Sequence, residues 1–295
     1  MAQIYRIALI TVGVVAFVLV LAMLPAVIQT APHQGGLLLN WKGGFSSIRD
    51  YFEGLRSGEA FRYLSGRTEL SFWEQICPSF KITLFYMGIG ALTAMTLGIL
   101  LGIYVAVSRK EWLKRVLEFT GILPDFLIIL VLQFAVVFIY LHTKVLIFEV
   151  ASTSSDDPAV ALPLISAVII PANYMIRNVA LHMSHALADD YINFAKARGM
   201  GKRTIVFFHA LPNVLPYVKA DMHKFMGILF GNLFIVEYLY NLDGVAMLVF
   251  SNAYGFEGYQ YSLAANGILT LLVLYAIGYA ILKLFLYGWE KVLLR

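Results

Sequence analysis

The chain has few charged residues and a single cysteine. Of its 295 residues only 14% are charged, against the roughly 25% usual in soluble domains. The lone cysteine, Cys77, excludes an intrachain disulfide and leaves the redox compartment undetermined. Hydrophobic residues make up 60% of the chain, which is more apolar surface than one water-soluble core can bury. The composition therefore predicts that most of the chain lies in a lipid bilayer.

Motifs for nucleotide, metal or hydrolase chemistry are also missing from the sequence. The segment Gly199–Thr204 resembles a phosphate-binding loop only in part, because Lys196 and Arg203 stand where that motif needs Gly and Ser or Thr. The histidines have no thiolate pair or HExxH pattern beside them, which argues against a metal site. No serine–base, paired-carboxylate or G-x-S-x-G pattern is found. The sequence therefore predicts a chain that is not an enzyme and binds no nucleotide, cofactor or metal of its own.

Six apolar runs, separated by polar segments, account for most of the chain. They are predicted at Ile7–Ile28, Ile82–Val107, Leu117–Leu141, Ala159–Leu181, Phe225–Tyr240 and Ser262–Leu286. Most reach the ~20 residues that a spanning helix needs. Two runs carry glycines four residues apart, Gly98 with Gly102 and Gly227 with Gly231. The first pair forms a small-residue face that lets another helix approach closely. We therefore expect an all-α, polytopic membrane protein with six transmembrane helices.

Positive charges divide the connecting segments into two kinds. Ser108–Arg115 and Asp189–Arg203 are rich in Lys and Arg, whereas 142–158 and 241–261 are nearly free of them. The positive-inside rule places the first pair in the cytoplasm and the second pair outside. The long polar segment 29–76 must then be extracytoplasmic, and its Arg residues count for less because long loops follow the rule less closely. With six spans, both termini are expected in the cytoplasm.

The most informative polar segment is Asp189–Pro216. Its first two residues are aspartates, which suit a helix start because carboxylates cap free N–H groups and favour the positive end of the helix dipole. Gly199 is expected to end this helix in a left-handed conformation. A second short helix is expected over 204–211, and Pro212 and Pro216 are expected to stop or turn it.

This segment resembles the cytoplasmic EAA loop of ABC importer permeases, whose pattern is E-A-A-x3-G-x9-I-x-L-P. Ala195 stands at the third position, Gly199 at the glycine, and Leu211 with Pro212 at the terminal pair. Three positions depart from the pattern, and they hold Asn193, Phe194 and His209. The departures fit the peptide/nickel branch of the family better, where the segment begins with Asp-Tyr and continues to Ala-x-Gly.

The resemblance implies that this loop couples the permease to ATPase subunits. The residues that it assigns to the coupling loop are Asp190, Tyr191, Phe194, Ala195, Ala197, Gly199, His209, Ala210, Leu211 and Pro212. The same resemblance implies a type I ABC importer permease fold from about residue 45 to the C-terminus. It divides the chain into a first helix with an extracytoplasmic segment (1–75), a five-helix transmembrane domain (76–288) whose coupling loop lies at about 182–219, and a cytoplasmic tail (289–295).

Three ionisable residues in or near the apolar runs are candidates for the translocation pathway. Glu237 stands where the peptide-permease branch has a similar Glu, and Arg177 matches the first arginine of a repeated pair in that branch. Asp125 follows Pro124 in a segment that resembles the S-x-P-x-F of that branch. Charges inside a membrane are costly and usually face a protein interior or an aqueous path. The alternative for Asp125 and Arg177 is a place at helix ends, where charged groups reach water.

The implied function is that of a permease subunit in the cell (plasma or inner) membrane, forming the pathway of an ATP-driven importer for di- or oligopeptides. The implied partners are a homologous second permease subunit, two cytoplasmic ABC ATPases that use the ATP, an extracytoplasmic solute-binding protein and the lipid bilayer. No nucleic acid is expected among them.

Two other functions stay open at this point. A nickel or metal-chelate importer belongs to the same branch, although the spans hold no dense cluster of His, Cys or carboxylates to ligate a bare ion along its route. An ion-coupled secondary transporter would predict inverted repeats and broken helices around a midplane site, and the sequence has no clear repeat.

Overall fold

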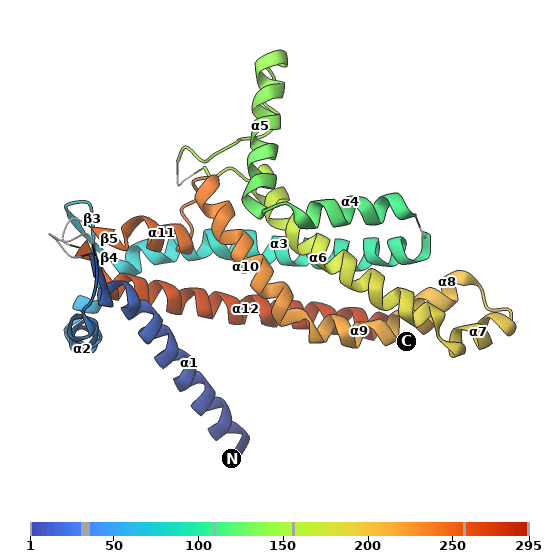
Figure 1. The fold of residues 1–295 in the computed structure, drawn as a ribbon, viewed down its shortest axis with the longest axis horizontal. Coiled ribbons are helices and arrows are strands. Elements are labelled where there is room, and N and C mark those ends of the chain that lie inside the picture. The colour runs from blue at the N-terminus through green and yellow to red at the C-terminus, as the bar shows by residue number, and fades with distance from the viewer. Residues whose placement is uncertain (1, 31–35, 109, 155–156, 256–257, 294–295) are drawn as a thin grey trace. The chain divides into compact units, whose positions relative to one another are not determined.

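The computed structural model describes residues 2–30, 36–108, 110–154, 157–255 and 258–293. Helices dominate the described chain, which confirms the predicted all-α class (Figure 1). Its strands pair into three short antiparallel hairpins, β1–β2, β3–β4 and β5–β6. The chain forms two compact units, one from Met1–Thr83 and Asp243–Leu274 and the other from Leu84–Leu242 and Tyr275–Arg295. We call them unit 1 and unit 2.

Unit 1 holds the N-terminal elements together with those that follow Leu242. Its elements are α1 (Ala2–Val27), β1 (Ile28–Thr30), β2 (Leu37–Leu39), α2 (Trp41–Ser57), the 3-10 turn η1 (Glu59–Phe61), β3 (Arg62–Ser65), β4 (Thr68–Ser71), the start of α3 (Phe72–Ser108), α11 (Val245–Asn252), β5 (Tyr254–Gly255), β6 (Gly258–Tyr259) and the start of α12 (Tyr261–Leu293).

Unit 2 holds the remainder of α3 and α12 and the elements between them. These elements are α4 (Glu111–Ile122), α5 (Asp125–Thr143), α6 (Ala161–Ala188), α7 (Asp190–Ala197), α8 (Lys202–Thr204), the π-helix η2 (Ile205–Ala210), α9 (Leu211–Ala220) and α10 (Met222–Leu239).

Five described helices are long and apolar enough to cross a membrane. Their candidate spans are Ala8–Val27, Phe72–Ser108, Asp125–Thr143, Ala161–Ala188 and Tyr261–Lys291. Helix α10 coincides with the expected fifth run but is not among these five, since polar residues such as Lys224, Asn232 and Glu237 interrupt its apolar sequence. The total of six spans stays a prediction.

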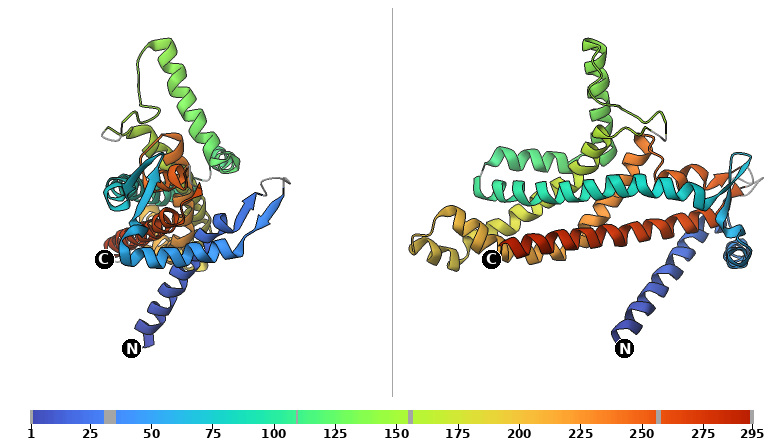
Figure 2. Two further views of the ribbon diagram at one scale, coloured as in Figure 1. Left: turned by 90° about the vertical axis from the view of Figure 1, so that its left-hand side faces the viewer. Right: turned by 180° about the vertical axis from the view of Figure 1, so that it is seen from behind.

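The third apolar run is divided, contrary to the expectation of one span over Leu117–Leu141. Helix α4 ends at Ile122 and α5 begins at Asp125, with Pro124 as its N-cap. A proline disfavours helical backbone at the residue before it, and Leu123 has an extended ψ of 134°. Most of the predicted basic loop Ser108–Arg115 is consequently the first half of α4. In Figure 2, α5 stands away from α4 and α6 over most of its length.

Helices α3 and α6 approach each other closely at the first glycine pair. A Cβ atom at Gly98 would lie 2.4 Å from Met175 Cγ, and one at Gly102 would lie 2.7 Å from Val179 Cβ and 3.0 Å from the Ile176 carbonyl oxygen. Real side chains do not tolerate such distances, so only glycine fits. The close approach that the sequence predicts for this pair is confirmed.

Helices α6 and α10 are joined by buried polar contacts. Asn232 is fully buried, and its Nδ2 donates to the carbonyl oxygens of Ser166 (3.0 Å) and Ala167 (3.2 Å). The hydroxyls of Ser166 and Tyr240 are 2.8 Å apart. These bonds fix α10 against α6, and the residues of both helices that face α4 line a cleft.

Candidate coupling segment and charged cleft

The candidate coupling segment, residues 189–220, begins with the helix that the two aspartates predict. Asp189 is the N-cap of α7, with an extended backbone (φ −68°, ψ 154°), but its side chain makes no capping hydrogen bond. The expected capping by Asp189 is therefore wrong in that detail. Asp190 lies in the first turn of α7, where a carboxylate favours the positive end of the helix dipole.

Gly199 ends α7 in the predicted left-handed conformation, with φ +76°. The amide of Gly199 donates to the Lys196 carbonyl (2.9 Å), and the amide of Met200 donates to the Ala195 carbonyl (3.2 Å). This pair of bonds is the Schellman arrangement, which satisfies the last free carbonyls of a helix. A Cβ at Gly199 would have no neighbour within 4 Å, so the position needs glycine for its backbone conformation and not for space.

The second half of the segment does not stop at its prolines, which corrects the expectation for Pro212 and Pro216. Pro212 lies in the first turn of α9, where a residue without an N–H is tolerated, and Pro216 lies inside the helix. The preceding π-helix places the Leu211 amide on the carbonyl of Val206, five residues back. Helix α9 then continues because it buries one apolar face, formed by Leu211, Val214, Leu215 and Val218.

The ten residues assigned to the coupling loop divide into an exposed and a buried set. The exposed residues are Asp190, Tyr191, Phe194, Ala197 and Gly199, and the buried ones are Ala195, Ala210 and Leu211, with His209 and Pro212 between these extremes. Phe194 is 66% exposed although it is apolar, and the Arg198 guanidinium lies 5.8 Å from the centre of its ring.

Asn213 joins the two halves of the segment. Its Nδ2 donates to the Tyr191 hydroxyl and to the His209 carbonyl oxygen, both at 3.0 Å. Phe208 in the second half is exposed, like Tyr191 and Phe194 in the first. The segment therefore presents aromatic side chains from both halves while its aliphatic residues pack inward.

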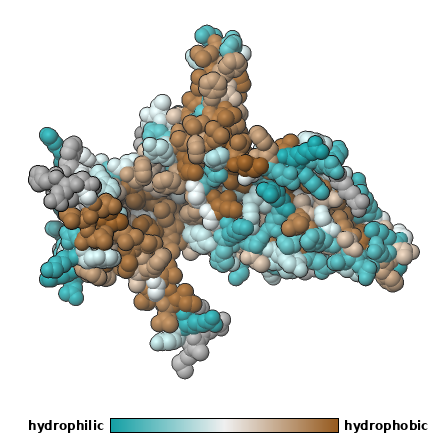
Figure 3. Space-filling model, in the orientation of Figure 1, coloured by the Kyte–Doolittle hydropathy of each residue, from teal (hydrophilic) through white to brown (hydrophobic). Residues whose placement is uncertain are grey.

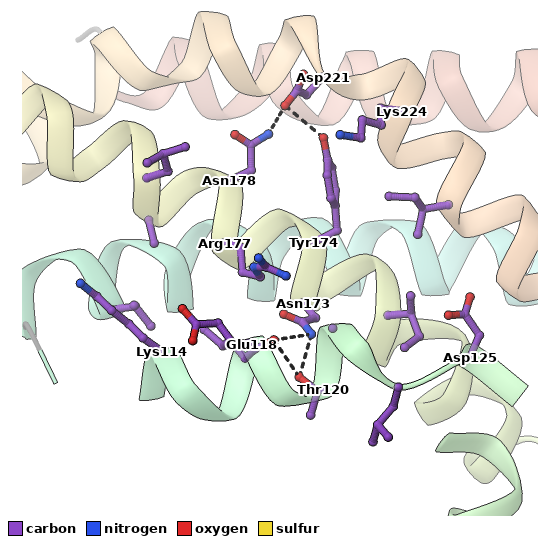
Figure 4. Close-up of a pocket in the computed structure, with 18 of the residues that line it drawn as sticks. Lys114, Glu118, Thr120, Asp125, Asn173, Tyr174, Arg177, Asn178, Asp221 and Lys224 are labelled. Atoms are coloured by element: carbon purple, nitrogen blue, oxygen red, sulfur yellow. Dashed lines mark hydrogen bonds between the residues drawn. The ribbon is translucent and has the colours of Figure 1, made fainter. Parts of the chain in front are cut away.

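A cleft of about 970 Å³ lies in unit 2 between α4, α6 and α10 (Figure 4). Its lining contains charged and titratable residues of both signs, namely Lys114, Glu118, Asp125, Arg177, His185, Asp221 and Lys224. The space-filling view shows polar residues gathered over this half of unit 2, whereas the projecting α5 is largely apolar (Figure 3).

Asp221, in the turn between α9 and α10, is held by two residues of α6. The Tyr174 hydroxyl donates to Asp221 Oδ2 at 3.1 Å, and Asn178 Nδ2 donates to the same oxygen (Figure 4). Lys224 Nζ lies 5.0 Å from the centre of the Tyr174 ring, which places a cation beside the carboxylate without a direct ion pair. The arrangement fixes one negative and one positive group at this wall of the cleft.

The opposite wall is formed by α4. Asn173 Nδ2 donates to Thr120 Oγ1 (2.7 Å) and to the Leu117 carbonyl (3.1 Å), and its buried Oδ1 has no partner among the described residues. A Cβ at Gly121 would lie 2.7 Å from Arg177 Nη1, so glycine makes room for the guanidinium. The described residues include no ion pair of Arg177, whose charge stays available inside the cleft.

The cleft brings together two of the three candidate pathway residues. Asp125 and Arg177 both line it, but Glu237 does not. Glu237 is fully buried in α10, and its carbonyl oxygen accepts from the Leu242 amide at 2.9 Å. The alternative for Asp125, a helix end, also holds, because it is the first residue of α5.

Most polar lining residues of the cleft were not predicted from the sequence, among them Tyr174, Asn178, Asp221 and Lys224. The sequence holds a weak signal for these four residues. Tyr174 and Asn178 are four residues apart on α6, and Asp221 and Lys224 are three apart at the start of α10, so each pair has the spacing of neighbours on one helix face.

Comparison with known protein families gives a match over most of the chain. A model of the family described as "Binding-protein-dependent transport system inner membrane component" matches residues 94–293, which include the candidate coupling segment and the cleft.

Three relatives illustrate the similarity. The metal-staphylopine import system permease protein CntB of Staphylococcus aureus is 27% identical over 179 residues, 59% of this chain and 55% of that protein. The glutathione transport system permease protein GsiC of Salmonella typhi is 29% identical over 182 residues, 60% of this chain and 57% of that protein. The oligopeptide transport system permease protein OppB of Salmonella typhimurium is 28% identical over 228 residues, 73% of this chain and 68% of that protein. The match spans little more than half the length of the first two relatives.

Proposed function

Because this chain belongs to the family of binding-protein-dependent transport system inner membrane components, we propose that it is the permease subunit of an ATP-driven importer for short peptides. The observation that carries the proposal is the family match over 94–293, which encloses a coupling segment of the expected build. Its membrane-spanning helices make it a multi-pass membrane protein, and the relatives include permeases named for oligopeptides, dipeptides and glutathione.

The coupling segment is proposed to dock into a groove of a cytoplasmic ATPase. Tyr191, Phe194 and Phe208 provide exposed aromatic surface, and a short helix that places apolar side chains in a groove is a common mode of recognition. The α7 helix is positioned by the Gly199 turn and by Asn213, so a displacement of the ATPase would move α9 as well. Helix α9 leads directly into α10, a wall of the cleft.

The cleft is proposed to form part of the solute pathway. A peptide carries a cationic amino group and an anionic carboxylate, and Asp221 and Arg177 offer groups of opposite charge in one cavity. Because these groups are few and partly engaged with neighbours, the cleft suits transient contacts, with recognition left to an extracytoplasmic solute-binding protein. Glu237 is proposed to act on the pathway electrostatically from within α10.

The proposed assembly contains a homologous second permease subunit, two cytoplasmic ATPases and the solute-binding protein. ATP is used by the ATPases, and this chain holds no nucleotide site in the proposal. Both termini are placed in the cytoplasm, from the charges of the connecting segments.

Uptake of labelled di- and oligopeptides by cells that lack only this chain tests the proposal. We expect uptake to be lost in these cells and to be restored by the intact gene. Uptake should stay lost when the restored cells carry a partner ATPase that cannot hydrolyse ATP. Unchanged peptide uptake with lost accumulation of a metal would replace peptides by metal chelates as the solute.

A metal-chelate importer is the second candidate function, and the similarity to the metal-staphylopine permease favours it. A chelated metal already has its ligands, so a pathway for it does not need a ligand cluster. The described residues contain no group of three His, Cys, Asp or Glu side chains able to hold a bare ion. The uptake experiment therefore includes chelated and free metal as separate arms.

The proposed orientation has its own test. Cysteines introduced at Ser154 and Ser251, in a background without Cys77, should react in intact cells with a reagent that does not cross membranes, while one at Lys202 should not. Labelling at position 202 without labelling at positions 154 and 251 would show that the orientation is the reverse of the one proposed.

A further inference from the structure

Helix α2, in unit 1, carries an exposed apolar stripe that the proposed transport function does not use. Trp41, Phe45, Ile48, Phe52 and Leu55 recur at intervals of four, three, four and three residues, so they lie on one face of the helix. Ile48 packs against the core, but the other four are exposed, Phe45 by 63%. The preceding strand β2 adds three exposed leucines, Leu37 to Leu39.

The position of α2 is fixed by the end of a spanning helix. The candidate span Ala8–Val27 has 20 residues, about 30 Å of helix, which is the thickness of the hydrocarbon core. The amide of Asn40, the N-cap of α2, donates to the Val27 carbonyl at 2.8 Å. A Cβ at Gly44 would lie 2.4 Å from Val27 Cγ2 and 2.8 Å from Met23 Cγ, so the first turn of α2 rests on the last turns of α1.

The same helix also contacts the beginning of a second span, α12. The Tyr51 hydroxyl donates to Asn266 Oδ1 at 2.7 Å, and the rings of Tyr51 and Tyr261 are 5.7 Å apart. Burial raises the pKa of Tyr51, so this hydroxyl stays a donor. Helix α2 thus lies where α1 ends and α12 begins, and Figures 1 and 2 show it running across the first turns of α12 rather than along them.

The exposed stripe lies next to the face by which α2 rests on α1. Gly44, which faces α1, is three residues after Trp41 and four before Ile48, so it shares their face. Lys42, Arg49 and Arg56 stand beside the stripe and are exposed, and Arg49 pairs with Glu53 at 2.7 Å. Cationic side chains beside an apolar face are typical of helices that lie in a membrane interface, where they reach lipid phosphates.

We propose that α2 is an interfacial helix, which lies in the plane of the bilayer surface with Trp41, Phe45, Phe52 and Leu55 among the acyl chains and Lys42 and Arg56 at the phospholipid phosphates. The hydrophobic strand β2 enters the same interface. The partner is the lipid surface itself, since α1 delivers the helix to that depth and tryptophan favours this zone. The helix would then hold the ends of α1 and α12 at a fixed depth.

The depth of single spin labels in the full-length chain tests this proposal. In a Cys77→Ser background, nitroxide labels are attached at Phe45→Cys and Phe52→Cys, with Asp50→Cys and Ser57→Cys as matched controls on the polar side of the same helix. The chain is placed in vesicles of phosphatidylethanolamine and phosphatidylglycerol, and collisions with oxygen, which concentrates in lipid, are compared with collisions with a water-soluble nickel chelate. A label at Val12, exposed within the α1 span, gives the reference for acyl chains.

The expected result is a several-fold higher ratio of oxygen to nickel collisions at positions 45 and 52 than at positions 50 and 57, close to the value at Val12. Equal ratios at all four positions of α2 would overturn the proposal. It would also be overturned if the labels at 45 and 52 were accessible to the nickel chelate and became immobilised only on addition of a solute-binding protein, because the stripe would then be a protein-docking surface. Neither outcome depends on which solute is transported.

Discussion

The two glycine pairs share one sequence spacing and differ completely in their surroundings. At Gly98 and Gly102, α6 lies so close that any side chain would collide with Met175 or Val179. At Gly227 and Gly231 of α10, an added Cβ would meet nothing within 4 Å, and Gly231 lines the cleft. The first pair is therefore occupied by a helix of the same chain, and the second is left open.

The difference shows that this glycine spacing allows another helix to pack closely but does not show whether one does. Two glycines four residues apart leave a flat surface on which another helix, a ligand or water can lie. In α3 the neighbour is part of the chain, so substitutions should act on folding. In α10 the surface is open, so substitutions should spare the fold of this subunit.

The largest effect is expected from Gly102→Leu. The added side chain would collide with Val179 and with the Ile176 carbonyl, which belongs to the backbone and cannot rotate away. Forced overpacking of a core costs about 1–3 kcal/mol and more when backbone must shift. The expected outcome is loss of the folded subunit from membranes, measured as the monodisperse yield after detergent extraction. The matched variant Gly231→Leu should be obtained in the same yield as the unchanged protein. A normal yield of both variants would contradict the conclusion that only the first glycine pair is closely packed.

Gly199→Val should come next, with an effect on transport and not on yield. This glycine needs a positive φ, which costs a residue with a Cβ about 1–2 kcal/mol, and β-branching adds to the strain. The turn between α7 and α8 should be distorted and solute-stimulated transport should fall sharply in reconstituted complexes.

Gly201→Val serves as the control for Gly199→Val. Gly201 is two residues away, has φ −66° and leaves open space at Cβ, so valine fits there without backbone strain. Undiminished transport by Gly199→Val, or an equal loss in both variants, would contradict a conformational requirement at Gly199.

Glu237→Gln should have a moderate effect, smaller than that of Gly199→Val. The side chain is buried on the helix that carries the open glycine pair, and the amide keeps its size while removing its capacity for negative charge. Initial rates of peptide uptake should decrease while the yield of the complex stays constant. A loss of yield instead would show that Glu237 supports the fold and does not act on the pathway.

The smallest effect is expected from Gly231→Ala. Alanine is favoured over glycine inside a helix by about 0.5–1 kcal/mol, and nothing obstructs its methyl group here. The melting temperature of the purified subunit should stay the same or rise slightly. Gly98→Ala should lower it, because the methyl would lie 2.4 Å from Met175 Cγ. A drop for Gly231→Ala would mean that this surface is closed.

Local features were predictable from the sequence where one residue decides the conformation. Gly199 is an example, since few other residues take a left-handed turn at a helix end. The division of the third run at Pro124 was not predicted, although a proline restricts the residue before it, because the sequence stays apolar on both sides of the proline.

Features that depend on residues far apart in the chain were not predictable. Asp221 meets Tyr174 and Asn178 from 47 and 43 positions away, and no local spacing reports this contact. The prediction that Pro212 and Pro216 end the helix was wrong for the same reason. A proline shows only where an N–H is missing, whereas α9 continues because other elements of the fold bury its apolar face.

The π-helix Ile205–Ala210 sets the rotational phase between the start of the second half of the coupling segment and α9. A turn with bonds between residues five apart contains one residue more than an α-turn, which rotates all that follows by about 100° relative to an uninterrupted helix. Ala210 and Leu211 are buried where this turn ends, and the buried apolar face of α9 begins at Leu211. The extra residue therefore sets which face of α9 is buried. Deleting one residue from the turn would leave an ordinary α-turn with α9 in place, whereas winding the same residues as an α-helix would rotate the apolar face of α9 by about 100°.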